Sequence, residues 1–320
     1  MTMPSLCPEE QTMTTLRTLM RYAAALSLPL LISTSSAAAD FEQSIPVSPG
    51  GTLRIDIPGG SIDVETHDED RVDIDARIQG GLELEVERVG NDVEVTGHVT
   101  GVFGFFGFGK VRVHARVPEH FHLDLRTQGG HVDVQELLGH VVARTSGGRI
   151  QVQQIEGNVA AETSGGSIEI KEIAGDLFGV TSGGSIRASE IEGSVEVETM
   201  GGSIRVNKVG GPVSAITTGG SIEVEFTGTP SGEVRTAGGS ITVKAPKESS
   251  FHLKARTIGG SVRLDDDFEK DDDRRRDPDR RERERRRSRH GVGELDVHVN
   301  GGGEALELDT TGGSIRVDSN

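Results

Sequence analysis

Glycine pairs recur along this chain at a fixed interval, and that interval constrains the fold more than any other feature. Pairs begin every 18 residues at 129, 147, 165, 183, 201 and 219, and further pairs begin at 238, 259 and 312. A single glycine lies midway through each regular unit, so that every unit divides into two nine-residue halves. A fixed period of this length is the signature of an architecture in which each repeat stacks on its neighbours.

The residues between the glycines alternate as they do in β-strands. The segments SIEIKEI (167–173) and SVEVET (194–199) place apolar or β-branched residues at alternate positions, a period typical of strands rather than helices. Nine residues are too few for a helical crossover, so each unit is predicted to be one coil of two strands and two tight corners. The predicted fold class is all-β, a single-chain β-solenoid that resembles a parallel β-helix, with about 18 residues per coil.

Stacking these coils in register places like residues in columns. The predicted apolar column consists of Val132, Ile150, Ile168, Ile186, Ile204, Ile222, Ile241, Val262 and Ile315. The threonine column, two residues before each glycine pair, consists of Thr127, Thr145, Thr163, Thr181, Thr199, Thr217, Thr236, Thr257 and Thr310. A serine column follows the glycine pair, and we interpret both hydroxyl columns as structural ladders at a corner.

The repeated phrase TSGGSI (163–168 and 181–186) is either a ligand loop used many times or a corner used many times. A phosphate loop needs a following lysine and a helix, and a calcium-binding solenoid turn needs an aspartate after the glycines. The glycine pair is followed here by Ser-Ile, so we interpret it as a corner. The predicted structural turn glycines are Gly147, Gly148, Gly165, Gly166, Gly183, Gly184, Gly201, Gly202, Gly219 and Gly220.

The chain begins with the features of a secretory signal peptide. Arg17 and Arg21 precede the apolar run 23–32, and small residues lead to Ala39, which is the order found before a signal cleavage site. We expect residues 1–39 to be removed, with Asp40 first in the mature chain and the only cysteine, Cys7, lost. The predicted location is therefore across the inner membrane, in the periplasm or outside the cell, with no membrane span.

The rest of the chain divides by pattern. Residues 40–125 alternate outside the regular period and are predicted to form an N-terminal β-hairpin cap and the first coil; residues 126–264 are the regular coils. Residues 265–290 are predicted to be a charged disordered insertion, and 291–320 the terminal coil. Capping is expected because an open solenoid end exposes a strand edge.

The segment GVFGFFGFGK (101–110) interrupts the strand pattern with four of the ten phenylalanines. One interpretation is a loop that folds over the open end of the solenoid. The other is an exposed apolar tip that contacts a membrane surface or a partner. On the second interpretation the candidate contact residues are Phe103, Phe105, Phe106 and Phe108.

The insertion 265–290 has two halves of opposite charge. Residues 265–273 carry seven acidic residues and one lysine, and residues 274–290 carry ten arginines and four acidic residues. One interpretation is a solvated disordered loop, and the other is an arginine-rich arm for anionic lipids or lipopolysaccharide. The candidate contact residues are Arg274, Arg275, Arg276, Arg285, Arg286 and Arg287.

No catalytic, cofactor-binding or metal-ligating residue is predicted. The acidic residues are spread over many coils rather than clustered as a polysaccharide-cleaving site requires, and the mature chain has no Trp or Tyr to stack on sugars. His114, His120 and His122 are expected to be surface residues rather than a zinc site. The net charge of -17 argues against a nucleic-acid partner.

The residues PGGTLRIDIPGGSIDVETHDEDRVDI (49–74), VRVHARVP (111–118) and the recurring T-x-GG-S-I units resemble the bacterial "putative adhesin" family of β-strand repeats. The resemblance implies a β-solenoid domain of unknown function in secreted and envelope proteins. The predicted function is a non-enzymatic, adhesin-like envelope scaffold or interaction module, whose partner is an unidentified envelope protein or surface polymer. The alternatives are a polysaccharide-active β-helix enzyme and an anionic-surface binder that acts through the arginine-rich insertion.

Overall fold

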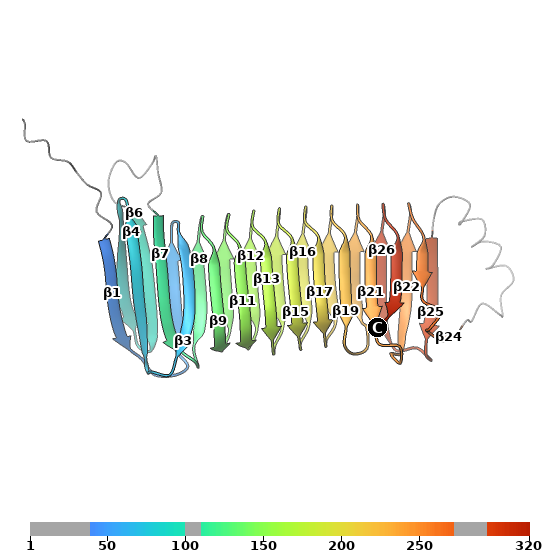
Figure 1. Ribbon diagram of the computed structural model, residues 1–320, viewed down its shortest axis with the longest axis horizontal. Coiled ribbons are helices and arrows are strands. Elements are labelled where there is room, and N and C mark those ends of the chain that lie inside the picture. The colour runs from blue at the N-terminus through green and yellow to red at the C-terminus, as the bar shows by residue number, and fades with distance from the viewer. Residues whose placement is uncertain (1–38, 100–109, 272–292) are drawn as a thin grey trace, which may run out of the picture. The chain divides into compact units, whose positions relative to one another are not determined.

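The structure is a computed structural model that describes residues 39–99, 110–271 and 293–320. The described residues belong to one compact unit, Ser36–Asn320. They form 27 strands in two sheets, seen side-on in Figure 1. Within these ranges, no helix has the length and apolar character needed to cross a membrane. The predicted signal peptide lies outside the described residues except for Ala39.

Each half of the 18-residue unit contributes a strand to a different sheet. In spatial order, sheet A contains β1 (Ala39–Pro46), β4 (Arg71–Gln79), β7 (Lys110–Pro118), β3 (Ser61–His67), β9 (Val132–Leu138), β11 (Ile150–Glu156), β13 (Ile168–Ile173), β15 (Ile186–Ile191), β17 (Ile204–Val209), β19 (Ile222–Phe226), β21 (Ile241–Ala245), β27 (Ile315–Ser319) and β23 (Val262–Leu264). Sheet B contains β24 (Lys270–Asp271), β25 (Gly293–Val299), β22 (Phe251–Thr257), β26 (Glu304–Thr310), β20 (Gly232–Thr236), β18 (Val213–Thr217), β16 (Val195–Thr199), β14 (Leu177–Thr181), β12 (Val159–Thr163), β10 (Val141–Thr145), β8 (His122–Thr127), β2 (Thr52–Ile57), β6 (Asp92–Val99) and β5 (Leu82–Val89).

The register of the regular coils follows the repeat. Ile168 of β13 pairs with Ile150 of β11 on one side and Ile186 of β15 on the other, in parallel. Thr163 of β12 pairs in the same way with the threonines 18 residues before and after it. The predicted β-solenoid with 18 residues per coil is confirmed, and it has two faces.

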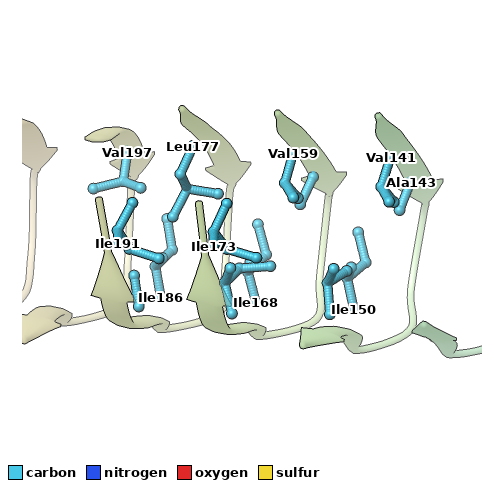
Figure 2. Packing of buried hydrophobic residues seen from close by; sticks show 14 of the residues in the cluster. Val141, Ala143, Ile150, Val159, Ile168, Ile173, Leu177, Ile186, Ile191 and Val197 are labelled. Carbon is cyan, nitrogen blue, oxygen red and sulfur yellow. The ribbon is translucent and has the colours of Figure 1, made fainter. Parts of the chain in front are cut away.

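The core lies between the two sheets. In Figure 2, Ile150, Ile168 and Ile186 of sheet A repeat along the stack, with Val141 and Val159 on the strands of the opposite sheet. These five side chains are at most 2% exposed. A coil alone buries no continuous core, so its stability depends on contacts with the coils on both sides.

The spatial order of the last coils differs from their order along the chain. Strand β26 pairs in parallel with both β20 and β22, and β27 pairs with both β21 and β23. The coil that ends the sequence is therefore inserted between two earlier coils. Strand β25 runs antiparallel to β22 on one side, and the turn at 300–303 leads from β25 to β26, which pairs with β22 on its other side.

The other end of the stack carries the predicted β-hairpin cap, which is confirmed. Strand β4 pairs antiparallel with β1 and with β7, and β5 and β6 form an antiparallel hairpin beside β2. These strands extend both sheets past the first parallel coil. The exposed edge at β5 carries alternating glutamates, which disfavour pairing with another chain.

The charged insertion begins later than the sequence suggested. Residues 265–271 were expected to be disordered, but Phe268 is only 2% exposed and packs edge-to-face on Phe251, with ring centroids 5.8 Å apart. Asp265 accepts a hydrogen bond from the Ser319 hydroxyl at 3.1 Å. The acidic half of the segment is thus partly folded because its one phenylalanine covers the core, whereas residues 272–292 lie outside the described residues.

The cap contains a buried carboxylate, Asp73, held by three partners. The Ser44 hydroxyl donates to it, Arg71 Nε lies 2.9 and 3.0 Å from its two oxygens, and Arg116 lies at 3.4 Å. Burial alone would raise the pKa of Asp73, but the hydrogen bonds from Ser44 and Arg71 and the charges of Arg71 and Arg116 outweigh it and lower the pKa. The carboxylate therefore stays ionised in the folded cap.

Asp73→Asn is expected to destabilise the chain by about 1–2 kcal/mol at pH 7, because the two arginines lose their counter-charge. A lowered folded pKa gives stabilisation that is present above the unfolded value, about 3.9, and is lost as the pH falls through the folded pKa. The difference between the wild type and the variant in urea denaturation should therefore shrink between pH 5 and pH 3. A difference that grew on acidification would contradict this role for Asp73.

Candidate functional site

The second glycine of each pair is required because successive coils approach closely at this corner. A Cβ built on Gly184 would overlap the carbonyl oxygen of Gly166 in the preceding coil, and the same overlap occurs at Gly148, Gly166, Gly202 and Gly220. The first glycine is different, because a Cβ on Gly183 would lie 3.6 Å from its nearest neighbour. Close approach of successive coils therefore accounts for only one of the two glycines.

The threonine column joins these corners through the main chain. The Thr181 hydroxyl donates to the carbonyl oxygen of Gly166 at 2.8 Å and accepts from the N–H of Gly184 at 3.3 Å. Each threonine hydroxyl therefore bonds glycine peptides of its own corner and of the preceding coil rather than the next threonine. A buried hydroxyl needs such partners, and the threonine at this position is only 2% exposed.

A second polar ladder runs along the other corner and was not predicted. His140 N–H donates to His122 Nδ1 at 3.1 Å, and Asn158 N–H donates to His140 Nδ1 at 3.1 Å. Asp176 and Ser194 continue the ladder. The signal was available, since each of the last four residues directly follows a midway glycine and carries a side-chain acceptor. This ladder is structural as well.

Sheet A contains a column of β-bulges. The left-handed residues Glu136, Gln154, Glu172, Glu190 and Lys208 have φ between 53° and 59°. The ladder between β11 and β13 passes from Gln153–Lys171 to Ile155–Ile173 and omits the residue between. An extra residue of this kind leaves the ladder and bends the strand. A non-glycine residue in this conformation costs roughly 1 kcal/mol of folding free energy, and the column has five such residues.

A groove of about 810 Å³ follows the bulge column across successive coils. Its floor includes Leu137, Ile155, Ile173 and Ile191, which close the core. Its remaining lining residues are Thr66, Glu119, Glu136, Leu138, Gln154, Glu156, Glu172, Ala174, Glu190, Glu192, Lys208, Gly210 and Thr227. The groove thus combines an apolar floor with a polar and mainly acidic rim.

Six glutamates and one lysine give the groove its charge. Lys208 Nζ lies 3.4 Å from Glu190, and Lys171, on the neighbouring sheet surface, forms an ion pair with Glu172 that raises the pKa of the lysine. The other four glutamates lining the groove are Glu119, Glu136, Glu156 and Glu192. Such a surface favours cationic over anionic partners.

The groove could have been anticipated from the spacing of the apolar residues. Within β9, β11, β13, β15 and β17 the buried positions step by two and then by three, as in Ile168, Ile170 and Ile173. An odd step in an alternating strand is the mark of an extra residue. The apolar column from Val132 to Ile315 covers only the first buried position of each strand and so does not reveal the bulges.

The structure does not bring the other candidate residues together in one site. Phe103, Phe105, Phe106 and Phe108 lie outside the described residues, and so do the six candidate arginines at 274–276 and 285–287. His114 lies on sheet A and His122 on sheet B. In the described ranges, no group of three or more His, Cys, Asp or Glu side chains is arranged to hold a metal ion.

Comparisons with known proteins give one family and several similar structures. Residues 52–292 match the model of the family Toastrack DUF4097. A "putative adhesin" from Parabacteroides distasonis is 11% identical, with 89% of this chain and 98% of that chain covered and a TM-score of 0.36. A "putative cell adhesion protein" from Clostridium sporogenes is 10% identical over 89% and 100% of the two chains, with a TM-score of 0.26. A "putative lipid binding protein" from Parabacteroides distasonis is 11% identical over 88% and 96%, with a TM-score of 0.29. No curated protein matches the chain.

Proposed function

The chain belongs to the Toastrack family, and on that premise we propose that it is a non-enzymatic, adhesin-like interaction module whose binding surface is the groove along the bulge column. The observation that supports this proposal most is the groove itself, in which an apolar floor and an acidic rim repeat over successive coils. A stack of coils held by Thr–Gly hydrogen bonds gives it a rigid backing. Rigid scaffolds with repeated surfaces suit extended partners.

Among the described residues, every carboxyl group with a clear pKa shift has a lowered pKa. A general acid on a polysaccharide enzyme needs a raised pKa. Hydrogen bonds from Ser194 lower the pKa of Asp176, and hydrogen bonding to Lys254 lowers the pKa of Glu307. The same direction holds for the other carboxyl groups with a resolved shift, which are Asp73, Glu223 and Asp265.

The proposed place of action is the cell envelope, reached through the signal peptide, in the periplasm or outside the cell. The partner is then an envelope protein or a surface polymer with cationic groups. In addition to the groove, the phenylalanines of 101–110 and the arginines of 274–290 stay as proposed contact residues. Only the groove lies wholly among residues that the structure describes.

Retention on envelope material tests this function. We expect the mature chain, residues 40–320, to co-sediment with isolated envelopes in low salt, and the triple change Glu136→Gln, Glu156→Gln, Glu192→Gln to reduce that retention. The matched control carries the same loss of charge outside the groove, at Glu169, Glu196 and Glu198, which are exposed. Equal retention of both triples would overturn the groove as the binding surface.

A glycan screen tests the rival function. The mature chain is incubated with acidic and neutral polysaccharides, and reducing ends are counted over time. We expect no turnover. Turnover that disappears on changing a carboxylate cluster would replace the binding module with a polysaccharide-active enzyme.

A further inference from the structure

The geometry points to a specific occupant for the groove: we propose that it receives the arginine-rich segment 274–290 of a second copy of this chain. The inference rests on the proposed function, because it names the partner of the same binding surface. It joins two features that are otherwise unexplained, an acidic groove on the coils and a basic segment in the sequence. The result is a head-to-tail association of copies in the envelope.

Charge complementarity carries the first step. The groove lining holds six glutamates and one lysine, a net charge of 1 − 6 = −5. The segment holds ten arginines and four acidic residues, a net charge of 10 − 4 = +6. The whole chain has a net charge of -17, so copies repel one another except where such opposite surfaces meet.

The shape of the groove favours an extended arginine-rich segment over a compact cation. Strands β9 to β17 are separated by four strand spacings, so the bulge residues extend over roughly 19 Å. An extended chain covers that length with about six residues. Arginine packs its aliphatic stem on apolar surface and leaves the guanidinium at the rim. Leu138 and Ala174, which are accessible at the surface of the groove, and the glutamates beside them offer both contacts.

Chain length favours a second copy over the same copy. The connection from Asp271 to Gly293 contains 21 residues, 272–292, and is tied at both ends. Its midpoint, 11 residues from either end, reaches at most about 40 Å, and β9 lies eight strand spacings, about 38 Å, from β23. The segment therefore reaches the far end of its own groove only when both halves are fully extended, and then with its middle residues alone. No such limit applies between two copies.

Sedimentation velocity on the mature chain tests the inference. We expect concentration-dependent association in low salt that weakens in high salt, because exposed ion pairs are screened. The groove triple (Glu136→Gln, Glu156→Gln, Glu192→Gln) should weaken association by at least about ten-fold, and so should glutamine at Arg274, Arg275, Arg276, Arg285, Arg286 and Arg287. The control triple at Glu169, Glu196 and Glu198 should associate as the wild type does. Circular dichroism melts establish that every variant is folded.

A mixing experiment separates association between copies from docking within one copy. The groove variant keeps its arm and the arm variant keeps its groove, so an equimolar mixture should form pairs and nothing larger. A mixture that stays monomeric, a wild type that is monomeric at all concentrations, or a control triple as weak as the groove triple would each overturn the inference. Groove-dependent retention on envelopes without self-association would overturn this inference alone and leave the proposed function standing.

Discussion

Replacing Gly184 by alanine should destabilise the chain by about 3 kcal/mol, the upper end of the usual cost of overpacking. The added Cβ meets the carbonyl group of Gly166 and the peptide of Ser167 rather than a side chain that could rotate away. The overlap is relieved only if the two coils move apart, and this movement weakens the hydrogen bond from the Thr181 hydroxyl to the Gly166 carbonyl oxygen. Urea denaturation followed by circular dichroism measures the loss.

Gly183→Ala is the matched control in the same corner. A Cβ there has no neighbour closer than 3.6 Å and Gly183 has no positive φ, so alanine restricts the unfolded chain without a clash. We expect stability to be unchanged or raised by about 0.5 kcal/mol. Equal destabilisation by both substitutions would show that the corner needs glycine for its conformation and not for close approach.

The repeat made the fold predictable because one geometric fact is copied many times. Each coil repeats the positions of Ile168 and Thr181, and parallel in-register stacking is the arrangement that aligns every column at once. The prediction of a corner at the glycine pair came from the same regularity. The repeat does not distinguish the two glycines of a pair, because both recur in every coil. Only the structure shows that the second one, such as Gly184, lies against the preceding coil.

Two other features escaped for different physical reasons. The order of the last coils is not encoded in the columns, because Ile241, Val262 and Ile315 present similar β-branched side chains to any neighbour. The order follows instead from β25, which pairs antiparallel with β22 and brings the chain back. The residue types at the bulges give no sign of them, because glutamate and lysine are unusual in the left-handed region, and only the spacing of the buried residues marks their positions.

The regular coils and the ends of the stack differ in what they require. An interior coil is covered on both sides, so its sequence needs only the apolar columns and the corner residues. A terminal coil also needs a side chain that closes the core, and the acidic run 265–273 contains a single phenylalanine. Its burial at the end of the stack indicates that the last described strands depend on it.

Phe268→Ala should therefore open this end of the solenoid, at a cost of about 3 kcal/mol for the lost aromatic side chain. Coils contact only their neighbours, so the loss should stay local. Hydrogen exchange should accelerate at the amides of β22 and β25 and stay unchanged in β13 to β16. The control is Phe178→Ala, because Phe178 is 39% exposed on sheet B, and its cost should stay within about 1 kcal/mol. Faster exchange throughout the stack would mean that the coils unfold as one cooperative unit, and unchanged exchange at β22 would show that Phe268 does not close the core.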